Sequence, residues 1–208
     1  MIIYVARHGE TDWNREGRYQ GRQESDLTET GRRQARAFAA SLHGRPIDAV
    51  ISSSLRRCRQ SAEPLADSLS QPVRVDDRLI EIDHGTWEGH LRGEIAVRDA
   101  ERFMAWQHEP QTVTFVGGES PADVRERWRA FASALSGYDE VAVVTHDVLV
   151  RIAILDATGR DVDRLWEPRV MNGGYARFES RGGRWSLLDE CIQAHLSGLV
   201  VDVTTQAL

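Results

Sequence analysis

The chain has 208 residues, of which 41% are hydrophobic, so it can bury the core of one globular domain and is too short for two independent ones. Its 26 Lys and Arg residues against 32 Asp and Glu residues give a formal charge of −6, which argues against a nucleic-acid or anionic-membrane surface and favours a small-molecule partner. All the basic residues are Arg, which excludes Schiff-base and P-loop lysine chemistry and requires any phosphate site to be built from arginine.

The N-terminal part of the chain alternates a predicted strand with a predicted helix. Residues 2–6 are a short apolar run, typical of a strand buried on both faces, which stops at Arg7 and His8. Residues 29–43 are predicted to be helical because their apolar side chains recur at helical spacing, with Thr28 as the cap. Polar residues therefore follow the first strand directly.

The same alternation continues through the middle of the chain. A strand is expected at residues 48–52, and a helix begins near Leu55. Residues 90–108 look helical with a weak apolar pattern, whereas Pro121 begins a helix with a clear apolar stripe. Residues 141–145 form a third candidate for a buried strand.

The third strand runs into His146 and is followed by an apolar helix at about residues 148–157. Turn residues then separate two further strand candidates, near residues 175–179 and 184–188. Residues 189–208 carry no motif and stay unassigned.

Strands and helices that alternate in this way predict an α/β fold with a mostly parallel sheet, in a single domain over residues 1–208. Such sheets bind ligands at the carboxyl ends of their strands. Three of the predicted strands would deliver Arg7 with His8, Arg57, and His146 to that edge.

The strongest motif is Arg-His-Gly-Glu-Thr at residues 7–11, because five specified residues directly after a buried strand are a far stronger signal than a lone histidine. It resembles the R-H-G-E-T signature of the histidine phosphatase superfamily, also called phosphoglycerate mutase-like. The resemblance implies a three-layer α/β/α fold, His8 as the nucleophile and Arg7 as a phosphate-binding arginine.

Later segments resemble the same family in chain order, so that the resemblance covers about residues 2–180. Residues 53–62 resemble S-x-L-x-R-A-x-Q-T-A, which implies that Arg57 is the second phosphate arginine. Residues 79–89 resemble L-x-E-x-x-x-G-x-W-E-G, which implies that Glu81 is the proton donor.

The substrate side of the site is less strongly marked. The resemblance implies Asn14, Gln20 and Gly21 as substrate contacts, although an Asn in a polar loop or a Gln before Gly is common for structural reasons. Residues 144–146 resemble V-S-H and imply that His146 is the second histidine of the catalytic pocket.

Three positions depart from the family pattern. His84 replaces the usual aromatic residue, and Cys58 replaces a small residue and is expected to pack rather than react. Asp147 stands where the family has glycine. Its carboxylate either faces the substrate, which favours a neutral, hydroxyl-rich leaving group such as a sugar, polyol or nucleoside, or caps the helix that begins near Val148.

The resemblance implies metal-independent hydrolysis of a small phosphate monoester through a phosphohistidine, and the residues suit this chemistry. A neutral imidazole is nucleophilic near pH 7, two arginines and a protonated His146 supply positive charge, and Glu81 serves as acid and then base. The other histidines show no metal-ligand spacing, so no metal or cofactor is expected. There are two alternatives. One is a phosphoglycerate mutase, and the other is a non-catalytic binding module that recognises phosphorylated ligands.

Location and assembly follow only in outline. Cys58 and Cys191 are the only cysteines, and the N-terminus has no signal-type apolar run, so we expect a reduced, cytoplasmic protein. No apolar stretch approaches the ~18 residues needed to cross a bilayer, so no membrane partner is expected. The oligomeric state is open, with a homodimer as one alternative.

Overall fold

A six-stranded sheet forms the centre of the computed structural model, which describes residues 1–207. The strands lie in the order β3-β2-β4-β1-β5-β6. The first four of these are parallel, and β5 and β6 are antiparallel to their neighbours. The strands are β1 (Ile2–Arg7), β2 (Ala49–Ser52), β3 (Val73–Val75), β4 (Glu140–Thr145), β5 (Tyr175–Arg181) and β6 (Arg184–Ile192). The predicted α/β fold with a mostly parallel sheet is therefore confirmed.

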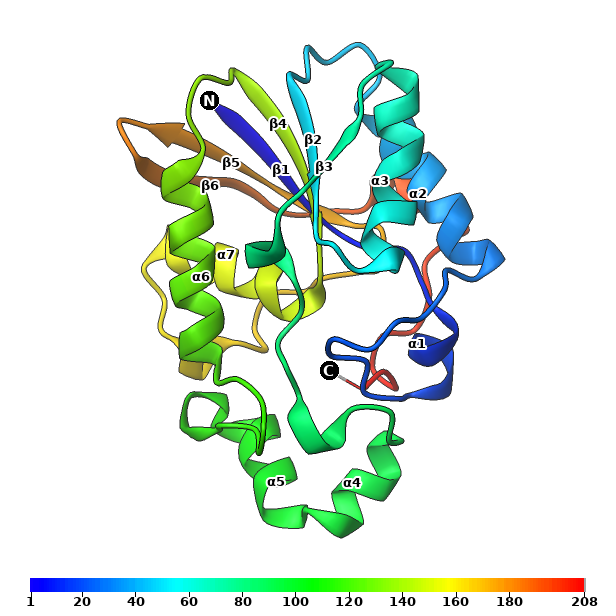
Figure 1. Ribbon diagram of the computed structural model, residues 1–208, viewed down its shortest axis with the longest axis vertical. Helices are drawn as coiled ribbons and strands as arrows, with labels where there is room; N and C mark the ends of the chain where they lie inside the picture. The colour runs from blue at the N-terminus through cyan, green and yellow to red at the C-terminus, as the bar shows by residue number, and fades with distance from the viewer. Residues whose placement is uncertain (208) are drawn as a thin grey trace.

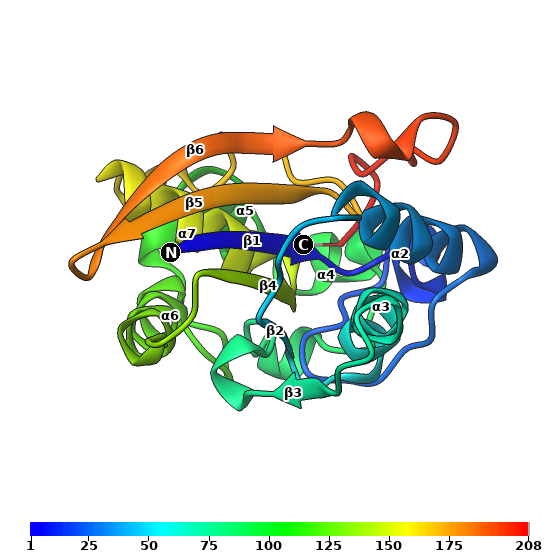
Figure 2. The ribbon, with the colours of Figure 1, turned by 90° about the horizontal axis from the view of Figure 1, so that it is seen from above.

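Helices cover both faces of this sheet, which gives the three layers that Figure 2 shows from above. One face carries α2 (Glu29–Ser41) and α3 (Arg56–Ser68), and the other carries α6 (Pro121–Ala134) and α7 (Asp147–Thr158). Three short helices lie beyond the carboxyl ends of the parallel strands in Figure 1: α1 (Asp12–Glu16), α4 (Arg92–Arg98) and α5 (Ala100–His108). Single 3-10 turns occur at Asp77–Leu79, Gly85–Trp87, Pro110–Thr112, Val162–Arg164 and Ala194–Leu196.

Alternation along the strands divides the core between the two faces. In β1, Ile3 and Val5 belong to the cluster that contains the buried side chains of α6 and α7, whereas Tyr4 and Ala6 belong to the cluster under α2 and α3. Successive strand residues point to opposite faces, so a continuous apolar run is what a strand between two helical layers requires. Both clusters hold the carboxyl ends of the strands in fixed positions.

The predicted elements are confirmed apart from their ends and three differences. Residues 90–108 are broken at Asp99 into α4 and α5. Neither β3 nor α1 was predicted. β3 is a three-residue edge strand with exposed Arg74 and Val75, and α1 has only five residues, so both are too short to show a periodic apolar pattern. Of the unassigned residues, 189–192 extend β6, and the following residues pass α2 toward α1, so that the described chain ends near the carboxyl ends of the parallel strands in Figure 1.

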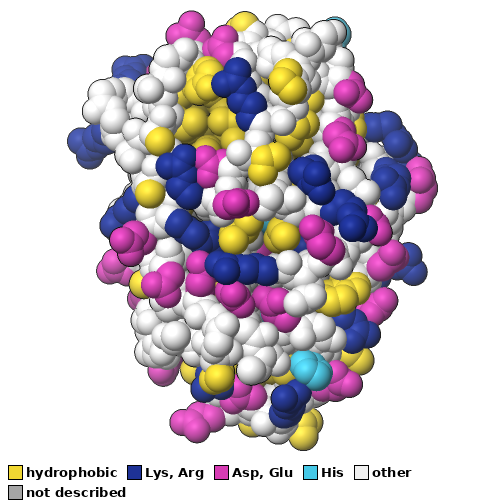
Figure 3. Space-filling model, in the orientation of Figure 1, with side chains coloured by type: hydrophobic (Ala, Val, Ile, Leu, Met, Phe, Trp, Pro, Cys, Tyr) yellow, Lys and Arg dark blue, Asp and Glu magenta, His cyan; other side chains and the backbone are white. Residues whose placement is uncertain are grey.

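The surface carries both signs of charge. Figure 3 shows acidic and basic side chains interspersed over one face, with apolar side chains grouped at its upper end. A hollow there lies between β3 and α6 and is lined in part by Val75, Phe131 and Leu135. Among residues 1–207, no helix is long and apolar enough to cross a membrane.

Candidate active site

Adjacent parallel strands bring the predicted residues together at one end of the sheet. Arg7 ends β1 and His8 follows it, Arg57 stands in the first turn of the helix after β2, and His146 directly follows β4. These four side chains are at most 3% exposed. A pocket opens beside them, lined by Arg7, His8, Asn14, Gln20, Gly21, Arg57, Glu81, His84 and Ala207.

His8 is held as a neutral imidazole with one nitrogen free for attack. Its Nδ1 lies 2.7 Å from the carbonyl oxygen of Gly9. Because a carbonyl oxygen only accepts hydrogen bonds, Nδ1 carries the proton and Nε2 keeps its lone pair. Burial, followed by the nearby charges of Arg57 and Arg7, holds the pKa of His8 well below its usual value, so the ring stays unprotonated at neutral pH.

The two arginines are anchored by their terminal nitrogens. Nη1 of Arg57 donates to Gln23 O at 2.8 Å and its Nη2 donates to Gly21 O at 2.7 Å. Nη1 of Arg7 donates to Val170 O at 3.0 Å, and Nη2 of Arg7 donates to Gln206 at 2.5 Å.

In each guanidinium the Nε atom has no hydrogen-bond partner among the described residues. Both Nε atoms, of Arg7 and of Arg57, are buried. An unsatisfied buried donor costs ~1 to 3 kcal/mol, more when the group is charged, and an anion in the pocket would satisfy both. The pair is therefore suited to hold phosphate oxygens beside His8.

His146 packs against the ring of His8. Its ring centroid lies 5.3 Å from that of His8, and its Nε2 is 2.8 Å from Ser53 Oγ. Burial, followed by the charge of Arg57, holds the pKa of His146 well below its usual value. In the free protein it is a neutral imidazole, contrary to the protonated state expected from the sequence. The thiol of Cys58, whose pKa burial raises, packs against it.

Glu81 is the carboxyl group of the pocket. Burial, followed by the nearby negative charge of Asp147, raises the pKa of Glu81 to about 7. Its Oε1 accepts a hydrogen bond from the backbone N–H of Ile82 at 2.9 Å. A second carboxylate in the same segment, Glu88, does not line the pocket; it accepts from the backbone N–H of Arg22 at 2.8 Å and of His84 at 3.3 Å, and so stabilises the loop. Glu81 alone combines a place in the pocket with a proton retained near neutral pH.

Of the four residues expected on the substrate side, Asn14, Gln20 and Gly21 line the pocket and Asp147 does not. Asn14 accepts from the backbone N–H of Thr11 at 3.1 Å and so closes the first turn of α1. Gln20 accepts from Thr11 Oγ1 at 3.0 Å. Gly21 has a φ of +49°, which favours glycine, and a Cβ there would have to displace the carboxylate of Glu88, 1.9 Å away.

The decisive comparison is with families of known sequence, since residues 3–192 match the family model described as the histidine phosphatase superfamily (branch 1). The chain belongs to this superfamily. It is 34% identical over 203 residues to "Phosphoserine phosphatase 1" of Hydrogenobacter thermophilus, which covers 96% of each chain. It is also 34% identical over 195 residues to "Glucosyl-3-phosphoglycerate phosphatase" of Mycobacterium tuberculosis, covering 88% of this chain and 86% of the relative.

A solved structure agrees with these sequence relatives. Bacillus stearothermophilus YhfR superposes with a TM-score of 0.88 at 31% identity, covering 94% of this chain and 98% of the other. This histidine phosphatase is a phosphoric monoester hydrolase that acts on small phosphorylated metabolites.

Asp147 occupies neither of the two places that the sequence suggested for this histidine phosphatase. It is 1% exposed, does not line the pocket, and makes no side-chain cap at the start of α7. Its Oδ1 lies 3.0 Å from Nη1 of Arg7, and its Oδ2 accepts from Nε of Arg151 at 2.5 Å. Asp147 is paired with Arg7 and Arg151 outside the pocket lining, so it cannot select a hydroxyl-rich leaving group by direct contact.

We expect Asp147→Asn to act on the pH profile and on stability, and not on specificity. Because Asp147 helps to raise the pKa of Glu81, its loss should move the alkaline limb of kcat/KM to lower pH. Breaking the buried pair should lower the free energy of unfolding by roughly 3 to 5 kcal/mol. Urea denaturation and kcat/KM on a sugar phosphate and a phosphoglycerate test this. A changed ratio between the two substrates would restore the substrate-facing orientation.

Two pocket residues were missed as site residues by the sequence reasoning. His84 was noted only as a departure from an aromatic residue, yet both its ring nitrogens are buried without a hydrogen-bond partner in the described chain. Burial lowers the pKa of His84 to about 3, so it offers the pocket a neutral donor and acceptor. Ala207 had no signal, because it is far from every motif in the sequence.

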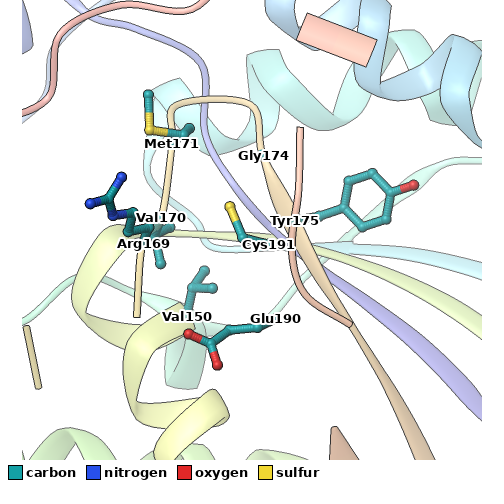
Figure 4. A pocket seen from close by; sticks show the side chains of 8 residues that line it. All are labelled: Val150, Arg169, Val170, Met171, Gly174, Tyr175, Glu190 and Cys191. Atoms are coloured by element: carbon teal, nitrogen blue, oxygen red, sulfur yellow. The ribbon is translucent and has the colours of Figure 1, made fainter. Parts of the chain in front are cut away.

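A second hollow lies behind the loop that carries Val170. Figure 4 shows the sulfur of Cys191 among the side chains of this pocket, close to the turn at Gly174. Burial raises the pKa of Cys191, which disfavours the reactive thiolate. The residues that line this hollow include no histidine, so we place the chemistry in the pocket of His8.

Proposed function

We propose that this histidine phosphatase hydrolyses its phosphate monoester in two displacement steps at His8. The observation that carries the proposal is the pair of buried, unpaired Nε donors of Arg7 and Arg57 beside a neutral imidazole. Phosphate oxygens that accept from both donors would hold the phosphorus atom within reach of Nε2 of His8. Protein positioning and charge stabilisation supply most of the catalysis in phosphoryl transfer.

In the first step Nε2 of His8 forms a bond to phosphorus, and the bond from phosphorus to the leaving oxygen breaks. Glu81 gives its proton to the leaving oxygen and becomes a carboxylate. In the second step this carboxylate takes a proton from water, whose oxygen bonds to phosphorus. The bond between phosphorus and nitrogen then breaks and frees inorganic phosphate and neutral His8.

The substrate class is the finer part of the proposal. We propose O-phosphoserine as the first candidate, because the phosphoserine phosphatase of Hydrogenobacter thermophilus covers nearly the whole chain. The wall beyond the arginines is built from neutral polar groups, among them Asn14, Gln20 and His84. Phosphate release from O-phosphoserine, 3-phosphoglycerate and a sugar phosphate ranks the candidates by kcat/KM. Analysis of the products from 3-phosphoglycerate would detect phosphoryl return to a second hydroxyl, the mutase reaction.

We expect turnover to be unchanged by EDTA. Within the described residues no three His, Cys, Asp or Glu side chains group into a metal site, and two arginines supply the positive charge at the phosphate. The measurement is p-nitrophenyl phosphate hydrolysis before and after chelation, with magnesium added back as the control. Vanadate should inhibit as a mimic of the pentacoordinate state. Activity that chelation stops and magnesium restores would overturn the proposed mechanism.

A further inference from the structure

The C-terminal residues after β6 follow the edge of the site. Leu196 is buried, and the backbone oxygen of Leu199 accepts a hydrogen bond from Nε2 of Gln34 at 2.8 Å. Further on, the carbonyl of Thr205 passes so close to Gly17 that a Cβ on that glycine would lie 2.9 Å from it. Figure 1 shows this last segment beside α2 and α1.

Gln206 then enters the polar centre of the molecule. It is only 4% exposed, and its Oε1 accepts from Nη2 of Arg7 at 2.5 Å and from Nδ2 of Asn14 at 3.2 Å. Its Nε2 donates to Oδ1 of Asn172 at 2.8 Å. One amide therefore joins a phosphate arginine to a substrate-side residue of the pocket, and Ala207 beside it lines the pocket itself.

We infer that Gln206 is a positioning residue that sets the orientation of Arg7 and Asn14, which makes the C-terminal segment a functional part of the active site. The inference rests on the proposed function for the role of Arg7. Val170 and Asp147 hold Nη1 of Arg7, and Gln206 holds Nη2, so these contacts fix the orientation of the guanidinium and of its unpaired Nε at the pocket that Arg7 lines.

The amide suits this position better than a carboxylate. Asp147 already provides one negative charge to Arg7, and a second would compete with phosphate for the guanidinium. A neutral amide oxygen orients Nη2 and leaves the positive charge available to substrate. The amide nitrogen at the same time fixes the orientation of Gln206 through Asn172.

The test compares Gln206→Met, which keeps the length of the side chain without its hydrogen bonds, with Gln206→Glu, which adds a charge. Thr205→Ala is the matched control, because Thr205 is exposed on the same segment. A hydrogen bond to a charged group is worth about a 10- to 100-fold change in affinity. We expect Gln206→Met to weaken binding of inorganic phosphate and vanadate by this factor and to lower kcat/KM similarly. Gln206→Glu should lose more, and Thr205→Ala nothing.

Binding of inorganic phosphate by calorimetry separates this inference from the proposed function, because it needs no turnover. A parent protein that binds phosphate without hydrolysing any ester would overturn the proposed function and leave Gln206 testable. If Gln206→Met lowers the melting temperature but binds phosphate as the parent does, the residue is only structural and the inference is wrong. Loss of folded structure in both variants of Gln206 would overturn it equally.

Discussion

His8→Ala is expected to abolish turnover while the fold stays intact. His84 also lines the pocket, but it belongs to the loop before the 3-10 turn at Gly85–Trp87, whereas His8 directly follows Arg7 at the end of β1, so we expect no substitute for the nucleophile. Loss of a nucleophile in a catalytic unit costs on the order of 10⁴-fold or more. His8 follows the core strand β1 and belongs to neither hydrophobic cluster, so we expect the protein to stay folded, which the melting temperature checks.

The measurement is a quenched reaction that traps the phosphoenzyme. The parent should give an acid-labile, base-stable phosphoryl adduct at one site per chain, and His8→Ala should give none. His108→Ala is the control, because His108 is exposed and does not line the pocket. Full activity in a folded His8→Ala protein, or a labelled adduct that survives the substitution, would contradict the proposed nucleophile.

Glu81→Gln is expected to have the second largest effect. An amide has the shape of the carboxyl group but cannot transfer its proton, so kcat for alkyl phosphates should fall by ~10² to 10⁴. With p-nitrophenyl phosphate, whose leaving group needs little protonation, the loss should be smaller. With this substrate the first displacement should be faster than the second, which still needs Glu81 as the base for water. A burst of about one p-nitrophenolate per chain should therefore precede slow turnover.

The pH dependence follows from the direction of the Glu81 shift. Its pKa is raised to about 7, so the acid form is present below that pH and is lost as pH rises through it. For alkyl phosphates, kcat/KM of the parent should therefore fall on the alkaline side of about pH 7. The pKa of His8 is lowered, so its neutral form persists on the acid side of its usual range. In Glu81→Gln the alkaline limb should disappear.

Glu88→Gln provides the matched control for this carboxyl group. Glu88 lies on the same loop, and its amide replacement keeps an oxygen that can accept from the backbone of Arg22 and His84. Its loss of kcat should be far smaller. Equal losses for Glu81→Gln on alkyl and p-nitrophenyl phosphates, or an alkaline limb that vanishes with Glu88 instead, would count against Glu81 as the acid.

Local sequence determined most of the framework and the reactive centre. Continuous apolar runs were enough to predict β1, β2 and β4, because a strand between two helical layers must be apolar on both faces. Parallel strands bring their carboxyl ends to one edge, so residues that follow those strands must meet there. Arg7, His8, Arg57 and His146 needed no further information to be placed together.

Tertiary structure decided the electrostatics of the site. The neutral state of His146 and the retained proton of Glu81 come from burial and from charges that lie far away in sequence. Asp147 looked like a substrate contact or a cap, since the sequence does not show that Arg7 and Arg151 converge on it. A pKa or an ion pair depends on distances in space, which no local pattern encodes.

The C-terminal segment is the clearest case of what sequence alone could not determine. Gln206 carries no motif, and its partner Arg7 is 199 residues away. An amide at the end of a chain is ordinarily a solvated group, and only the return of residues 199–207 to the sheet edge makes it a buried ligand of a catalytic arginine. Motifs report chemistry that neighbours in sequence perform together, whereas this contact forms only because the folded core brings Arg7, at the carboxyl end of β1, and Gln206 together beside one pocket.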